Sequence, residues 1–97
     1  MFDGRHCTKK DLDLLVEETN KIMAFLEKEG TFADISEMPE IKNYLGIIAR
    51  FDIEVAERIQ MGIKSSSDIE RIKKVIENNV SALRQNVIVD IYEHQKL

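Results

Sequence analysis

The chain contains one proline, four glycines and no tryptophan among its 97 residues. Proline and glycine supply most β-turns, so their scarcity disfavours a fold made of many short strands. The same composition suits long helices. A chain of this length forms one domain. We therefore expect residues 1–97 to be a single all-α domain, with residues 1–7 as a flexible N-terminal tail.

Cysteine and long apolar runs are also scarce. Cys7 is the only cysteine, which excludes an internal disulfide framework and fits a reducing cytoplasm. No apolar run approaches the roughly 20 residues that a membrane-spanning helix needs. The first residues show no hydrophobic signal-peptide centre. The sequence therefore predicts a cytoplasmic protein with no membrane contact.

Acidic residues outnumber basic ones by 18 to 14, which gives a net charge of −4. A surface of this charge repels nucleic acid on average. The short basic clusters also stand beside acids, a pattern typical of a solvent-exposed helix face. These features argue against nucleic acid as a partner.

Apolar residues recur at helical spacing in three segments. We predict helices over residues 9–29, 39–64 and 68–95. Short loops make successive helices neighbours, so the expected fold is an antiparallel three-helix bundle. Gly46 and Asp52 weaken the second helix, because glycine disfavours a helix interior and Asp52 projects near the apolar face. A break near residues 50–53 would give four helices instead.

The three predicted helix starts have recognisable sequence signals of an N-terminus. Thr8 with Asp11, and Ser67 with Glu70, have the spacing of a capping box, in which two residues satisfy free N–H groups at the helix start. Pro39 suits a first-turn position, because its missing N–H would have been unpaired there. These signals support the predicted helix starts.

The residue sets that usually carry catalysis or metal binding are missing. The sequence has no Gly-Lys-Ser/Thr loop, no Cys-x-x-Cys and no His-x-x-x-His pair. Asp90 and His94 lie one helical turn apart, and we interpret them as a surface pair. We interpret Asp52 as a boundary carboxylate paired with a basic residue of a neighbouring helix. The sequence therefore predicts no enzyme, cofactor, metal site or small-molecule substrate.

Apolar side chains in excess of the core are the feature that most favours a function. On the last helix, several apolar residues fall off the core stripe: Val75, Ala82, Ile88, Val89 and Tyr92. Contiguous exposed apolar area usually marks a protein interface. We therefore predict that these five residues bind protein. The alternative is that they widen the contact within the bundle.

Our leading hypothesis is a small non-enzymatic helical protein that binds another protein or itself. Adaptors, chaperones, inhibitors and assembly subunits all fit this description. A homodimer is the expected form, because excess apolar surface on a small helical chain is often covered by a second copy.

The alternative hypothesis is a DNA-binding transcriptional regulator. Residues 55–75 resemble a divergent helix-turn-helix, with Ala56 in the first helix and Gly62 near the turn. Gly62 follows Ala56 by six residues where the usual pattern has four, and the second helix would begin with the acids Asp68 and Glu70. The resemblance implies DNA contacts by Arg71, Lys73 and Lys74.

Overall fold

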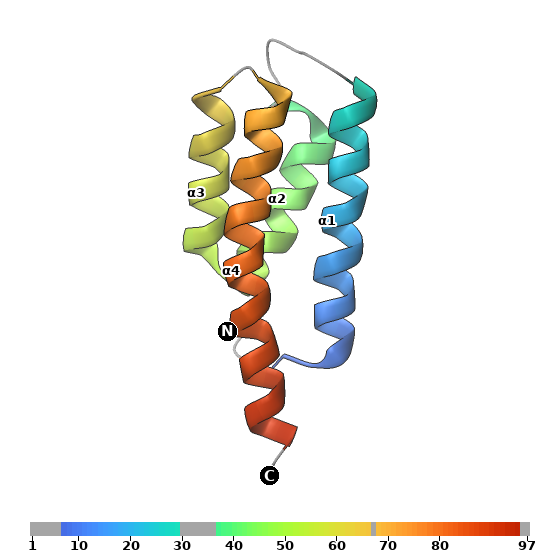
Figure 1. Cartoon of the computed structure of the whole chain (residues 1–97), viewed down its shortest axis with the longest axis vertical. Helices are drawn as coiled ribbons and strands as arrows, with labels where there is room; N and C mark the ends of the chain where they lie inside the picture. Colours follow the sequence, from blue (N-terminus) through green and yellow to red (C-terminus); the bar gives the residue numbers. More distant parts are fainter. Residues whose placement is uncertain (1–6, 30–36, 67, 96–97) are drawn as a thin grey trace.

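The computed structural model describes residues 7–29, 37–66 and 68–95, and these residues form four α-helices. The helices are α1 (Lys9–Glu29), α2 (Pro39–Phe51), α3 (Ile53–Lys64) and α4 (Ile69–Gln95). Figure 1 shows that successive helices run in opposite directions. Each helix packs on the next, and α4 also packs on α1. The predicted all-α class is confirmed, and the predicted count of three helices is corrected to four.

The predicted second helix is interrupted at Asp52, whose backbone is extended (φ −160°, ψ 112°). Its N–H donates to the carbonyl of Ile48 and so closes α2, while its carboxylate accepts the N–H of Glu54 at 3.0 Å and caps α3. Aspartate is a favoured N-cap residue because its side-chain oxygen satisfies a free N–H. The structure thus shows a capping role for Asp52, where the sequence suggested an ion pair to a neighbouring helix.

The start of α1 is a capping box, as predicted. The N–H of Thr8 donates to Asp11 Oδ2 at 2.7 Å, and the N–H of Asp11 donates to Thr8 Oγ1 at 3.4 Å. Pro39 opens α2, which confirms the predicted start of that helix.

The cap of α4 differs from the prediction. Asp68 Oδ1 accepts the N–H of Glu70 at 3.1 Å, and the Asp68 carbonyl accepts the N–H of Ile72. The helix therefore begins one residue later than predicted. Ser67, the predicted cap, lies outside the described residues.

The core lies between the four helices and is built from apolar residues spaced three or four apart. Its largest fully buried side chains are Leu15, Leu26, Ile41, Ile48, Ile59, Ile72, Ile76, Leu83 and Val87. A hydrogen bond between Thr19 Oγ1 and Tyr44 Oη, 2.8 Å apart, joins α1 to α2 beside this core. Burial raises the pKa of Tyr44 to about 12, and the hydrogen bond to Thr19 offsets only part of that rise.

The helices differ in length, so the two ends of the bundle differ in thickness. α1 and α4 have 21 and 27 residues, whereas α2 and α3 have 13 and 12. At 1.5 Å per residue, α4 is roughly 20 Å longer than α2 or α3. Figure 1 shows α4 continuing past the turn between α2 and α3, with the start of α1 beside it. We term this part, residues 7–12 with residues 86–93, the two-helix end, and the remainder the four-helix end.

Cys7 anchors the chain at the two-helix end. Its side chain is buried, and its N–H donates to Asp90 Oδ2 at 2.7 Å. Burial raises the pKa of the Cys7 thiol, and the nearby carboxylates of Asp90 and Asp11 raise it further. The predicted flexible tail is therefore wrong for Cys7, which contacts a residue 83 positions away. Residues 1–6 lie outside the described residues.

Across the described ranges, none of the helices combines the length and the apolar character that crossing a membrane requires.

Candidate docking surface on α1 and α4

Four of the five predicted interface residues are exposed on α4. Their exposed fractions include 39% for Ile88, 51% for Val89 and 60% for Tyr92, and Ala82 is also exposed. The fifth residue, Val75, is half-buried. The five residues therefore occupy two different environments.

Val75 belongs to the contact between α3 and α4. A Cβ atom built on Gly62 of α3 would lie 2.5 Å from Val75 Cγ1, so the Val75 side chain packs directly against the α3 backbone at Gly62. Val75 therefore takes part in the contact within the bundle, which is the alternative that the sequence left open. That Val75 also binds another protein stays a prediction.

The exposed residues nearest the end of α4 gather with residues from the start of α1. Ile88 and Tyr92 line a shallow hollow of about 230 Å³, together with the half-buried Leu12 and Ile91 and with Lys9. We term these five residues the end patch. The patch lies at the two-helix end, where α1 and α4 extend beyond the α2–α3 hairpin (Figure 1). Val89 is 100° away from Ile88 around the helix and is not part of this hollow.

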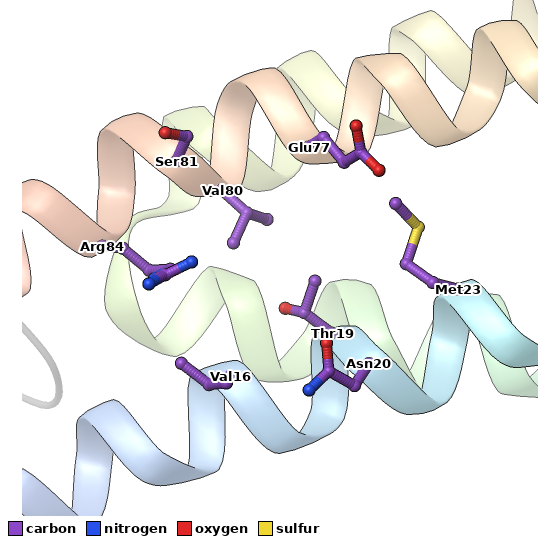
Figure 2. A pocket seen from close by; sticks show the side chains of 8 residues that line it. All are labelled: Val16, Thr19, Asn20, Met23, Glu77, Val80, Ser81 and Arg84. Carbon is purple, nitrogen blue, oxygen red and sulfur yellow. The ribbon is translucent and has the colours of Figure 1, made fainter.

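A second hollow, of about 280 Å³, follows the same two helices toward the four-helix end. We term it the central groove. Its lining residues are Val16, Thr19, Asn20 and Met23 of α1, and Glu77, Val80, Ser81 and Arg84 of α4. Figure 2 shows Glu77 and Met23 at one end of this groove and Arg84 and Val16 at the other. Acid, base and apolar side chains thus occupy separate positions along it.

The end patch and the central groove form one continuous surface. Leu12 and Val16 are four residues apart on α1, and Arg84 and Ile88 are four residues apart on α4, so each pair lies on the same side of its helix. We term the combined surface the α1–α4 face. It includes apolar side chains at the two-helix end and mixed polar and apolar side chains at its middle.

An ion pair joins α1 to α4 near the start of α4. Lys73 Nζ lies 2.7 Å from Glu27 Oε1. The hydrogen bond to Lys73 lowers the pKa of Glu27, and the same bond raises the pKa of Lys73. Salt bridges near the surface contribute little to stability, so this pair is not the main force that holds α1 against α4.

Exposed apolar side chains also occur on α3. The exposed fractions of Ile53 and Met61 are 63% and 71%. Ile53 lies at one end of a groove between α2 and α3 of about 420 Å³, whose floor includes the small residues Gly46 and Ala49. The α2–α3 groove is therefore a second candidate docking surface.

Sequence reasoning missed half of the α1–α4 face. Leu12 and Val16 fall on the apolar side of α1 and look like core residues until the length of α2 and α3 is known. The sequence does contain a signal for Glu77 and Arg84. Opposite charges seven residues apart lie on the same side of a helix, separated by two turns.

A comparison with protein-family models, with curated proteins and with solved structures finds no match for this chain. Among the described residues, no three His, Cys, Asp or Glu side chains are placed to hold a metal ion. Asp90, predicted to pair with His94, accepts the Cys7 N–H, and the His94 side chain lies outside the described part of the chain. The candidate site of this chain is the α1–α4 face.

Proposed function

We propose that this chain is a small non-enzymatic protein that acts by binding another protein or a second copy of itself, through the α1–α4 face. The observation that carries the proposal is the end patch, in which exposed Ile88 and Tyr92 share a hollow with Leu12. Small soluble proteins seldom keep such side chains together at the surface unless a partner covers them.

The energetics indicate that the end patch needs the central groove beside it. Full burial of one large apolar side chain contributes roughly 1.5–3 kcal/mol, whereas association costs an estimated 4–15 kcal/mol in lost freedom of motion. Ile88 and Tyr92 alone fall near the lower limit of that cost. The polar groups of the central groove would then set the register and add to the binding energy.

This function is compatible with an adaptor, a chaperone, an inhibitor or an assembly subunit, and we expect self-association into a homodimer. We place the protein in the cytoplasm, because a single buried thiol suits a reducing compartment.

No structural observation favours the DNA-binding alternative. Helix-turn-helix pairs cross at about 90–120°, whereas Figure 1 shows α3 and α4 side by side along the bundle. Lys73, one of the implied DNA contacts, pairs with Glu27.

The proposal is tested by changing Ile88 to Asp. The matched control is Asn78→Asp, which adds the same charge at an exposed position of α4 outside both hollows. Both variants should fold as the parent does, judged by circular dichroism. We expect Ile88→Asp to be monomeric in light scattering and to capture fewer proteins from a lysate of the native host. Asn78→Asp should self-associate and capture proteins as the parent does.

The proposal fails if the parent chain stays monomeric and captures the same proteins as Ile88→Asp.

A further inference from the structure

The residues that line the central groove are arranged symmetrically about its centre, with complementary side chains at its two ends. On α1, Val16 and Met23 are equally far from the point between Thr19 and Asn20. On α4, Glu77 and Arg84 are equally far from the point between Val80 and Ser81. In Figure 2 these two midpoints face each other across the groove, with Met23 beside Glu77 and Val16 beside Arg84.

A half-turn about an axis that lies just outside the groove, parallel to the line joining these midpoints and perpendicular to the helices, exchanges the two ends of the groove. It places an acid over a base and an apolar side chain over another apolar side chain. We infer that the central groove binds the same groove of a second copy, with Glu77 of each molecule against Arg84 of the other. This inference rests on the proposed function and specifies its occupant.

A two-fold axis makes every such contact twice, so one matched pair of residues contributes two ion pairs. Glu77 and Arg84 are both exposed, and seven residues separate them by about 10.5 Å along α4. Ser81, near the axis, has a small side chain that allows the two α4 helices to approach each other. Val16 against Met23 supplies apolar contact on the α1 side.

The same rotation brings the end patch of one molecule alongside the start of α4 of the other. Ile88 then lies level with Lys73 of the second copy, which is held in its own ion pair with Glu27. The end patch is thereby continuous with the inferred dimer contact. Charge complementarity sets the register, and the apolar contacts contribute the affinity.

The groove between α2 and α3 provides a direct comparison, because its lining residues have the same spacing. The half-turn would place Lys42 over Ala49 and Ile53 over Gln60. Neither pairing matches a charge with its opposite or an apolar side chain with another. Self-complementarity therefore distinguishes the α1–α4 face from the α2–α3 groove.

Charge reversal tests the inference. Glu77→Arg would place two arginines against each other in the dimer, and Arg84→Glu would place two glutamates against each other. We expect each single variant to weaken the dimer by roughly tenfold or more in sedimentation equilibrium, since like charges at an interface are strongly unfavourable. Glu57→Arg on α3, an exposed acid outside the α1–α4 face, is the control and should leave the dimer unchanged.

Restoration is the sharper result. An equimolar mixture of Glu77→Arg and Arg84→Glu should form a heterodimer, because both of its contacts then join opposite charges. The double variant should associate with itself for the same reason. A merely structural effect of either substitution would not be reversed by mixing.

Cross-linking locates the axis independently. Ser81→Cys should form a disulfide-linked dimer under mild oxidation, because the axis passes beside this position, whereas Ser65→Cys at the end of α3 should not. The parent chain, whose only cysteine is buried, gives the background level.

The inference is overturned if the parent is monomeric at all accessible concentrations, if the single charge reversals dimerise as the parent does, or if mixing fails to restore the dimer. If binding is insensitive to Glu77 and Arg84 but is lost in Ile88→Asp, the inference fails while the proposed function stands. If binding is insensitive to all three positions, both fail.

Discussion

The two ends of this bundle contain similar apolar residues in different environments. At the four-helix end, Ile76 and Leu83 of α4 are fully buried, because α1 and α3 both cover that stretch of the helix. At the two-helix end, Ile88 and Tyr92 of the same helix are exposed. Ile76 and Leu83 lie on the core stripe of α4, whereas Ile88 and Tyr92 lie off it; Val87, which is on the stripe, is buried even at the two-helix end. Because α4 extends beyond α2 and α3, its off-stripe residues at this end form a candidate binding surface with the start of α1.

The largest expected difference between the two ends is the loss of stability when an apolar side chain is truncated to alanine. Leu83→Ala should destabilise the fold by about 2–5 kcal/mol, because it removes a fully buried side chain and leaves a cavity. Ile88→Ala should cost less than about 1 kcal/mol, because much of that side chain already contacts water. Urea unfolding of the two variants at low protein concentration measures both values. Equal losses would mean that the two-helix end is packed as tightly as the core.

Tyr44 makes the four-helix end sensitive to high pH. Its pKa is raised to about 12 in the folded state and is about 10 when unfolded, so the unfolded chain releases the proton more readily. The contribution of protonated Tyr44 to stability is fully present below pH 10. The free energy of unfolding should fall by up to about 2–3 kcal/mol as the pH rises toward 12. Urea unfolding at pH 9 and near pH 11.5 measures the loss.

Tyr44→Phe is the control for that experiment. It should remove this part of the pH dependence, whereas Tyr92→Phe should keep it, because Tyr44 remains. If Tyr44→Phe and the parent lose the same stability between pH 9 and 11.5, burial of the Tyr44 hydroxyl is not the cause.

The hydrogen bond from the Cys7 N–H to Asp90 joins the start of the described chain to α4. Asp90→Ala removes the acceptor of the Cys7 N–H and should cost about 1–3 kcal/mol. The same change should speed the reaction of the Cys7 thiol with a disulfide reagent, because Asp90 and burial together raise the thiol pKa. Asp13→Ala, an exposed acid on α1, should change neither quantity. An unchanged thiol reaction rate in Asp90→Ala would contradict the anchor.

Two glycines should respond to alanine in opposite directions. Gly46→Ala should stabilise the fold by about 1 kcal/mol, because alanine is the better helix former and nothing lies within 4 Å of the new Cβ. Gly62→Ala should destabilise by about 1 kcal/mol, because its Cβ would overlap Val75 and force α3 away from α4. Thermal unfolding of both variants compares them. Stabilisation by both would remove Val75 from the α3–α4 contact.

The helices and most of their ends could be predicted from local patterns, because caps and apolar spacing act over one or two turns. The sequence indicates the break near Asp52 only as an alternative, from Gly46 and from the position of Asp52 near the apolar face. Phe51 and Val55 continue the apolar spacing through the break, and both are buried, so the spacing alone does not reveal it.

The candidate site was predictable only in part for a related reason. Exposure of Ile88 and Tyr92 follows from their position off the core stripe of one helix. The contribution of Leu12 and Val16, the burial of Val75 and the anchoring of Cys7 all depend on which distant element lies nearby. The contact between Cys7 and Asp90 joins opposite ends of the sequence and leaves no local pattern.

The central claim is that the α1–α4 face, and not the exposed apolar residues of α3, receives a second protein molecule. A dilution series of methyl-labelled protein followed by nuclear magnetic resonance tests it most directly. The account predicts that the methyl signals of Val16 and Ile88 shift with concentration while the Ile53 signal stays in place. Signals that are all independent of concentration, or a shift confined to Ile53, would contradict it.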